Sequence, residues 1–175
     1  MYFGRIEHEK GIEILLKSFA NVHPKNPFLK LHLIGEGNYL DHSKKLSHKL
    51  NINNNIVFYG WKENDEVQKI MLGCDLCVLQ SRIESFGLTI VEAMAAGIPV
   101  ISATAGAIPE IIKDGETGLL VPSEDIEALT KAIFYALENR DKTQNMPKVA
   151  QKMVKEKFSW DLSAKKFIEI YKSIL

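Results

Sequence analysis

Two glutamates eight positions apart, Glu84 and Glu92, are of a type and spacing that could bind or transform a ligand. Glu92 lies in the run 88–96, where Thr89 is the only other polar residue. A helix that is apolar nearly all round is normally buried, and a buried carboxylate is costly unless it is hydrogen-bonded. We therefore expect Glu92 to have a partner, either within the protein, with Arg82 as an example, or in a ligand.

The residues between the two glutamates predict an anion site. Ser85-Phe86-Gly87 precedes the expected helix, which leaves the backbone N–H groups of Gly87 and Leu88 free at a helix N-terminus. Glycine at position 87 has no side chain to keep a phosphate away. Glu84 just outside the helix, and Glu92 about one turn inside it, can accept hydrogen bonds from sugar or ribose hydroxyls, as the acidic residue of dinucleotide folds does.

A pair of cations near the start of the chain is also suited to an anion. A strand ends at Gly4, Arg5 follows it, and Lys10 opens a helix. Arginine offers a fork of donors to phosphate oxygens, and lysine adds a mobile point charge. A lysine at a helix start is unfavourable for the helix dipole, which makes sense if Lys10 and Arg5 attract one anion. The alternative, two solvated charges beside acidic neighbours, stays open at this point.

Other motifs carry less information. The glycine turn Gly35-Glu36-Gly37 either approaches a phosphate or is only the tight turn that its place after a strand requires. Cys74 and Cys77 lack further zinc ligands nearby, so we expect them to pack in a reduced core. The histidines are scattered without metal spacing, and neither a Ser-His-Asp arrangement nor a Walker-type loop is present. We expect no metal and no other cofactor.

The composition is that of one globular domain of 175 residues, with 46% hydrophobic and 25% charged residues. Lysine plus arginine and aspartate plus glutamate both number 22, so no basic surplus marks a nucleic-acid-binding protein. No cationic, apolar signal sequence opens the chain. We expect a cytoplasmic protein.

The elements that must position these residues alternate between strand and helix. Strands are predicted at 1–3, 29–34, 56–59, 75–80, 99–103 and 118–121. Helices are predicted at 10–22, 39–50, 65–72 with Asn64 as cap, 88–96, 109–113, 123–138 with Ser123 as cap, and from about Asp141 to the end, with Phe158-Ser159-Trp160 marking the last helix. This order predicts an α/β fold, a Rossmann-like doubly wound parallel sheet of about six strands in a single domain. Ligands then bind beyond the carboxyl ends of the strands. A central strand of three residues is unusually short and predicts a piece of a longer chain.

In combination, these segments resemble the donor-binding, C-terminal domain of a GT-B-fold retaining glycosyltransferase of family 4, the glycosyl transferases group 1. The resemblance covers nearly the whole chain in family order, and its central block is highly specific. The segments that carry it are Gly4-Arg5, Lys10-Gly11, the block from Ser81-Arg82-Ile83-Glu84-Ser85-Phe86-Gly87-Leu88 through Val100-Ile101, Gly106-Ala107-Ile108-Pro109-Glu110, and Asp114-Gly115-Glu116-Thr117-Gly118-Leu119-Leu120-Val121.

The resemblance implies a catalytic role for three residues. Arg5 and Lys10 would neutralise the donor diphosphate and assist its departure, and Glu84 would bind hydroxyls of the transferred sugar. It also implies retention of anomeric configuration by front-face attack, so Glu84 is not assigned as a nucleophile. The donor-binding residues that it implies are Gly4, Trp61, Lys62, Ser85, Phe86, Gly87, Leu88 and Glu92. Among these, Glu92 would bind ribose hydroxyls, and Trp61 and Lys62 would lie near the base.

The resemblance further divides the chain into a nucleotide-sugar-binding domain, 1–158, and a C-terminal helix, 159–175. That helix would pack toward an N-terminal acceptor-binding domain that is missing here, which would leave Trp160, Phe167 or Tyr171 partly exposed. The implied enzyme is hexosyltransferase-like and takes a UDP-, GDP- or ADP-sugar and a saccharide or lipid-linked acceptor, as in polysaccharide biosynthesis. We expect the isolated chain to transfer little or nothing. Association of the full enzyme with the inner face of the membrane is left open.

Three other functions compete with this one. The first is a stand-alone nucleotide-sugar-binding module that works with a separate acceptor subunit. The second is a GT-B nucleotide-sugar epimerase, against which Arg5, Lys10 and Glu84 favour transfer. The third is a signalling α/β domain, which would need a phosphoacceptor carboxylate cluster that the sequence does not show.

Overall fold

The protein is an α/β domain whose six strands all run parallel. The structure, a computed structural model, describes residues 1–139 and 145–174. The strands are β1 (Tyr2–Phe3), β2 (Leu31–Ile34), β3 (Ile56–Phe58), β4 (Cys77–Leu79), β5 (Val100–Ala103) and β6 (Leu119–Val121). They form two three-stranded sheets in the orders β1-β2-β3 and β4-β5-β6. The predicted α/β class and its parallel strands are confirmed.

The two sheets meet along β1 and β4. The backbone N–H of Val78 donates to the carbonyl of Met1 at 2.9 Å, and the amino group of Met1 donates to the carbonyl of Leu76 at 2.5 Å. Across this seam the strands follow the order 3-2-1-4-5-6 of dinucleotide-binding folds. The single six-stranded sheet that we predicted is thus two sheets side by side, because β1 is too short to form a full ladder with β4.

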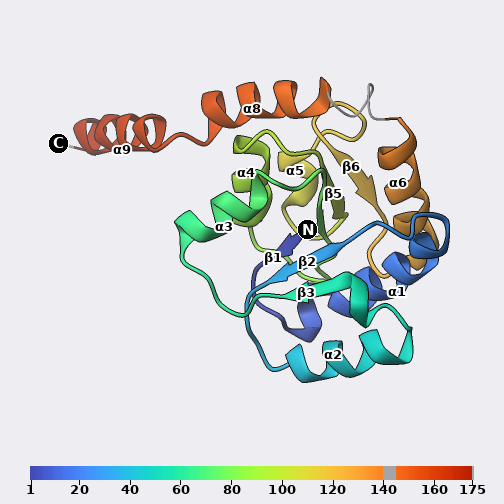
Figure 1. The fold of residues 1–175 in the computed structure, drawn as a ribbon. Coiled ribbons are helices and arrows are strands. Elements are labelled where there is room, and N and C mark those ends of the chain that lie inside the picture. The colour runs from blue at the N-terminus through green and yellow to red at the C-terminus, as the bar shows by residue number, and fades with distance from the viewer. Residues whose placement is uncertain (140–144, 175) are drawn as a thin grey trace.

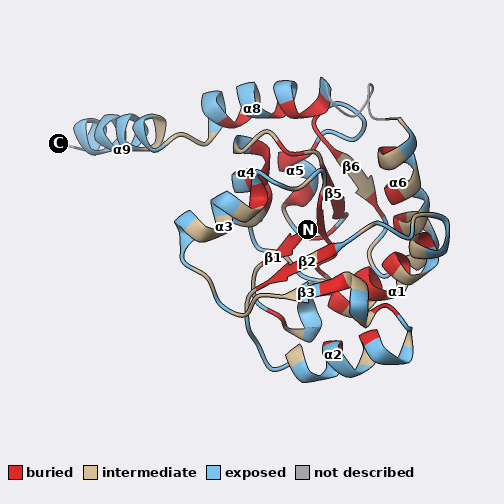
Figure 2. Ribbon diagram, in the orientation of Figure 1, coloured by how far each residue is buried: buried red, intermediate tan, exposed pale blue. Residues whose placement is uncertain are grey.

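Helices cover both faces of the strands (Figure 1). The α-helices are α1 (Ile12–Val22), α2 (Leu40–Lys49), α3 (Asn64–Met71), α4 (Leu88–Ala95), α5 (Ile108–Ile111), α6 (Ile126–Glu138), α8 (Asn145–Lys157) and α9 (Trp160–Ile174). Short 3₁₀ helices are η1 (His8–Lys10), η2 (His23–Lys25) and η3 (Asn53–Asn55). Helix α1 contacts α2 and α6, whereas α4 contacts α8. The buried residues lie mainly in the strands and on the inner faces of these helices (Figure 2).

Two predicted helix caps are each displaced. Helix α3 has Glu63 as its cap instead of Asn64, and the backbone N–H of Glu63 donates to the Glu66 carboxylate at 3.4 Å. Helix α6 has Asp125 as its cap instead of Ser123, and its carboxylate accepts from the backbone N–H of Ala128 at 2.8 Å. In both cases the residue with extended backbone torsions, and not the smaller polar residue near it, ends the loop.

Helix α9 points away from the rest of the domain and has no buried residue (Figures 1 and 2). Trp160, Phe167 and Tyr171 are exposed, as predicted. That this helix packs toward another domain stays a prediction. Of the predicted helical stretch, Asp141 and Leu175 lie outside the described residues.

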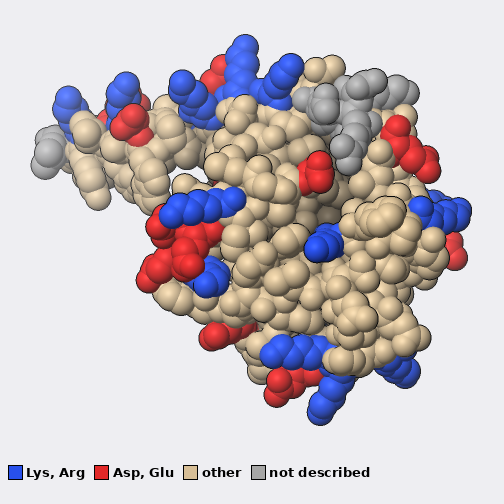
Figure 3. Space-filling model, viewed as in Figure 1, with Lys and Arg blue, Asp and Glu red and all other residues tan. Residues whose placement is uncertain are grey.

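Charged side chains of both signs are mixed over the surface seen in Figure 3. Lysine side chains gather over α8, where Lys148, Lys152 and Lys155 are all exposed. None of the described helices combines the length and apolar character that a membrane crossing requires.

Candidate active site

The loops that follow β1 and β4 face each other across a cavity of about 390 Å³. Because these strands are neighbours at the point where the strand order reverses, a crevice opens beyond their carboxyl ends. Eight of the proposed site residues line this cavity, namely Gly4, Arg5, Lys10, Glu84, Ser85, Phe86, Gly87 and Leu88. The structure thus brings these residues together, while their roles stay predictions.

An ion pair between Lys10 and Glu84 lies at the centre of this arrangement. The Lys10 Nζ is 2.8 Å from Glu84 Oε2, and the side chains are only 17% and 20% exposed. The Ser81 hydroxyl donates to the same carboxylate oxygen at 3.1 Å. For Lys10 the alternative of a solvated surface charge is therefore wrong. The pair places a cation and a hydrogen-bond acceptor side by side in a half-enclosed space.

Arg5 lies at the rim of the same crevice. Its guanidinium is 2.8 Å from the Glu7 carboxylate, and its side chain is 70% exposed. A second cavity of about 430 Å³ shares Arg5, Lys10 and Glu84 with the first. The hydroxyl of buried Tyr2 donates to the Arg5 carbonyl at 2.5 Å, and burial raises the pKa of Tyr2, which keeps this hydroxyl protonated as a donor. Tyr2 thus holds the Arg5 backbone, whereas the guanidinium faces solvent beside Glu7, which fits the alternative of a solvated charge for Arg5.

The N-terminus of α4 opens onto the cavity. The first helical hydrogen bond runs from the N–H of Ile90 to the Gly87 carbonyl at 2.9 Å. The N–H groups of Gly87, Leu88 and Thr89 have no acceptor in the part of the chain that the structure describes, so the predicted Gly87 and Leu88 amides are both free. Free amides and the positive end of the helix dipole favour an anion here, next to the Lys10 side chain.

Glycine at position 87 has a structural reason as well as the predicted one. Gly87 is buried and left-handed, with φ of 96°, and a Cβ there would lie 2.7 Å from the Ile108 Cδ1 in α5. That the missing side chain also lets a phosphate approach stays a prediction. The aromatic ring of Phe86 packs edge-on against Phe158 at 5.7 Å, which ties this loop to the end of α8.

Glu92 lies on an exposed face of α4, so its predicted burial is wrong. Leu88, Glu92 and Ala95 are exposed and lie along one side of the helix. The Glu92 carboxylate forms no hydrogen bond or ion pair with another described residue, and Arg82, the internal partner considered, binds Glu124 instead. Glu92 lines a groove of about 410 Å³ between α3 and α4. Partial burial in this groove raises the pKa of its carboxyl group.

Besides Glu92, two other proposed donor-binding residues lie outside the Lys10–Glu84 cavity. Trp61 and Lys62 follow β3 in the loop to α3, where Trp61 is 62% exposed. The Lys62 ammonium is 3.0 Å from the Glu66 carboxylate. Both lie at the carboxyl end of the sheet, but neither lines the cavity or the groove at Glu92.

The glycine turn after β2 serves as a structural support. A Cβ on Gly35 would lie 1.9 Å from the Gly4 carbonyl oxygen, so the turn packs directly on the backbone of the site loop. The N–H of Ile6 also donates to the Glu36 carbonyl at 2.8 Å. Of the two functions left open for this turn, the close backbone contact favours the tight turn.

Two residues in the site were not singled out from the sequence. Ser81 orients Glu84, and Gly106, left-handed with φ of 51°, packs behind it. A Cβ on Gly106 would lie 1.8 Å from the Glu84 carbonyl oxygen, and the N–H of Ala107 donates to that oxygen at 3.4 Å. The Gly106 segment contributed to the family resemblance, but its contact with Glu84 joins distant parts of the chain.

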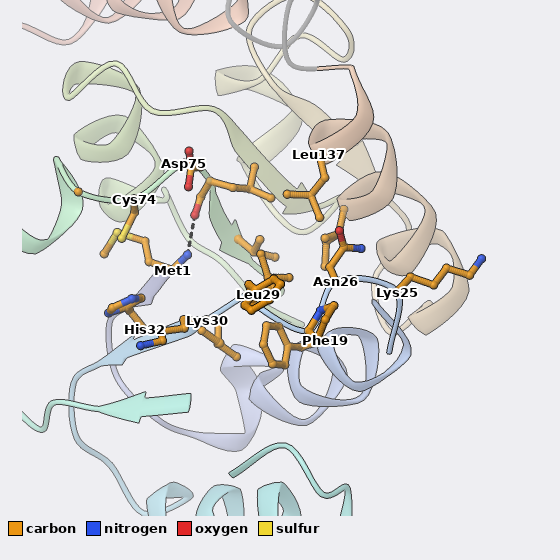
Figure 4. A pocket seen from close by; sticks show the side chains of 17 residues that line it. Met1, Phe19, Lys25, Asn26, Leu29, Lys30, His32, Cys74, Asp75 and Leu137 are labelled. Carbon is orange, nitrogen blue, oxygen red and sulfur yellow. Dashed lines mark hydrogen bonds between the residues drawn. The ribbon is translucent and has the colours of Figure 1, made fainter. Parts of the chain in front are cut away.

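A larger cavity, of about 700 Å³, lies at the opposite end of the strands (Figure 4). It is lined by apolar residues of β2, β4 and α6, with Lys25, Lys30 and Asp75 among the polar ones. Met1 lies at its wall, with its amino group bonded to the Leu76 carbonyl. It contains none of the proposed site residues. Within residues 1–139 and 145–174, no three potential metal ligands cluster anywhere.

Fold and site together define a Rossmann-like domain whose crevice is equipped for an anionic ligand with hydroxyl groups. The Glycosyl transferases group 1 family matches residues 1–153, and the chain belongs to this family. An uncharacterized glycosyltransferase of Methanocaldococcus jannaschii, MJ1607, is 31% identical over 98% of this chain and 44% of its own length.

Solved structures give the same result. Anabaena Alr3699/HepE in complex with UDP and glucose superimposes with a TM-score of 0.91 at 27% identity, over 98% of this chain and 47% of that protein. The C-terminal domain of a glycosyl transferase group 1 family protein from Francisella tularensis superimposes with a TM-score of 0.83 at 25% identity, over 91% of this chain and 85% of that domain. The chain therefore corresponds to the C-terminal domain of GT-B glycosyltransferases and spans about half the length of the relatives that it matches.

Proposed function

We propose that this chain is the nucleotide-sugar-binding half of a retaining glycosyltransferase. The observation that carries the proposal is the Lys10–Glu84 pair, 2.8 Å apart, in a cavity bounded by the N-terminus of α4. A nucleoside diphosphate sugar presents a dianionic diphosphate next to a polyhydroxylated ring. Lys10 and the free amides of α4 suit the diphosphate, and the Glu84 carboxylate suits the sugar hydroxyls.

The same groups favour the transfer step. As the bond between the anomeric carbon and the diphosphate breaks, negative charge grows on the departing diphosphate. Lys10 and the free amides at the start of α4 are held in place before the reaction, and together with the solvent-facing head of Arg5 they stabilise this charge more than that of the ground state. The Glu84 carboxylate holds the sugar in place by accepting hydrogen bonds from the hydroxyl groups of the sugar.

The nucleoside would occupy the groove between α3 and α4. Glu92 faces this groove without a protein partner among the described residues, and its carboxylate suits the two hydroxyls of a ribose. Trp61 and Lys62, farther along the same edge of the sheet, are then left for the base. Similar proteins solved in complex with UDP support the binding of a nucleotide.

The acceptor would be bound by a second domain. The matched relatives are about twice as long as this chain, and the exposed apolar residues of α9 offer a contact surface. The acceptor is then a saccharide or a lipid-linked saccharide, and the isolated chain binds its donor but transfers little.

Titration calorimetry of the chain with UDP, GDP and ADP, followed by their sugars, tests the proposal. We expect one nucleoside diphosphate to bind more tightly than the other two, and its sugar to bind to the same site in competition with it. Absence of binding by all three diphosphates and their sugars would overturn the proposal.

Replacement of Glu92 by glutamine is expected to weaken binding of the preferred nucleoside diphosphate roughly tenfold, since hydrogen bonds to a charged group are the stronger ones. Inorganic pyrophosphate, which lacks a ribose, should bind both proteins equally.

The raised pKa of the Glu92 carboxyl group means that folding favours its protonated form, so this contribution to stability is present at acid pH and lost as the pH rises through the pKa of the folded state. Glu92→Gln should therefore fold at least as stably as the parent at neutral pH.

Calorimetry and thermal unfolding measure both effects. A variant that unfolds more easily but binds the nucleotide as before would show that Glu92 has a structural partner instead.

A further inference from the structure

Arg82 makes three interactions directly beside the Lys10–Glu84 pair. Its Nε is 2.7 Å from the Glu124 carboxylate, and its guanidinium also donates to the carbonyl of His8. Its backbone N–H donates to the carbonyl of Glu9 at 2.7 Å. The Arg82 side chain is only 17% exposed, but its bonds to Glu124 and to the His8 carbonyl lie at the protein surface.

These bonds fasten the two halves of the site to each other. His8 and Glu9 are the two residues before Lys10, and Glu84 follows Arg82 by two positions. Arg82 therefore holds the backbone of η1 against the loop after β4, and the Lys10–Glu84 contact of 2.8 Å spans these same two segments. A shift of either segment would change how the Lys10 ammonium faces the cavity.

Glu124 anchors the guanidinium from a third segment. It lies in the loop between β6 and α6 with φ of 64°, a left-handed conformation that side chains other than asparagine and glycine rarely adopt. Its own side chain is 61% exposed, so neither burial nor packing accounts for a glutamate here. The one ion pair that it forms within the described residues is with Arg82. A strained residue whose side chain makes a single specific contact points to a role for that contact.

We infer that Arg82, anchored by Glu124, is a positioning residue that sets Lys10 against Glu84 in the diphosphate site. This inference rests on the proposed function. Lys10 and Glu84 both line the two cavities of the site, whereas Arg82 lines neither. Arg82 therefore acts through Lys10 and Glu84 and does not touch the ligand. The planar fork of arginine serves Glu124 and the His8 carbonyl at once in a fixed geometry, which the flexible ammonium of lysine does not reproduce.

The decisive variant is Glu124→Gly. Glycine adopts the left-handed conformation without strain, so the variant should unfold at the same temperature as the parent or at a higher one. Loss of the Glu124 carboxylate should nevertheless weaken binding of the preferred nucleoside diphosphate about three- to tenfold. The reason is that the charge-assisted bond from Lys10 to the diphosphate would then be misaligned. A merely structural ion pair would lower the unfolding temperature and leave binding unchanged.

Two further variants separate positioning from charge. Arg82→Lys keeps the positive charge but loses the fork, and it should bind the nucleotide roughly tenfold more weakly. Glu127→Gln is the control, because it removes an exposed ion pair away from the site, the pair with Lys131 at 3.9 Å on α6. This variant should bind the nucleotide like the parent. Parent-like binding by both Glu124→Gly and Arg82→Lys would overturn the inference.

A measurement without nucleotide keeps this inference distinct from the proposed function. The side-chain NMR signals of Lys10 report its contact with Glu84, with Glu84→Gln as the reference for a lost pair. In Glu124→Gly and Arg82→Lys these signals should shift toward the reference, whether or not the protein binds nucleotides. Parent-like signals in both variants would overturn the positioning role, whereas failure of the parent to bind any nucleoside diphosphate would overturn only the proposed function.

Discussion

Replacement of Lys10 by methionine is expected to weaken binding of the preferred nucleoside diphosphate by about 10- to 100-fold, since hydrogen bonds to charged groups contribute about 1.5–3 kcal/mol. Methionine has a similar length and removes the charge with little change in volume. The effect is large because the Lys10 ammonium is only partly exposed and lies beside the α4 amides, where water competes weakly for the anion. Titration calorimetry at constant ionic strength measures the change.

Lys17→Met is the matched control. Lys17 forms an ion pair of 2.5 Å with Glu13 on α1 and lines neither cavity at the site. It should bind the nucleotide like the parent. Added salt should weaken the parent's binding more than that of Lys10→Met, because one fewer charge is screened. Equal affinities of parent and Lys10→Met would exclude Lys10 from the diphosphate site.

The sequence predicted which residues line the Lys10–Glu84 cavity, because these residues are concentrated in two loops. Gly4, Arg5 and Lys10 follow one strand, while Glu84 to Leu88 follow another, and the ends of parallel strands meet at one edge. Alternation of strand and helix therefore sufficed to place both loops at the same crevice. The family resemblance added the roles, which spacing alone does not provide.

What the sequence could not predict depends on contacts between distant segments. An apolar run predicts burial, yet Glu92 of α4 is exposed beside the groove between α3 and α4. Arg82 and Glu124 are 42 positions apart, so their pairing has no signature in local spacing. The same holds for Gly106, whose neighbour Glu84 belongs to a different loop. The polar residues near the starts of α3 and α6 also led to helix caps that are misplaced by one and two residues. The backbone geometry of the preceding loop decides which residue caps each helix.

The contact behind Glu84 leads to the largest expected change in stability. Replacement of Gly106 by alanine is expected to lower the free energy of unfolding by about 3 kcal/mol, which combines ~1–2 kcal/mol for a left-handed alanine with ~1–3 kcal/mol for overpacking. The new Cβ would lie 1.8 Å from the Glu84 carbonyl oxygen, so the backbone of the two loops must separate. Urea unfolding measures the loss.

Gly115→Ala provides the matched control for backbone strain. Gly115 is also left-handed, with φ of 72°, but a Cβ there would meet nothing within 4 Å. This variant should therefore lose only the ~1–2 kcal/mol of a left-handed alanine. Because the displaced loop carries Glu84, Gly106→Ala should also lose affinity for the nucleotide sugar beyond any loss for the nucleoside diphosphate alone, while Gly115→Ala binds both like the parent. Equal losses of stability in the two variants would show that the close approach behind Glu84 is not what requires glycine at position 106.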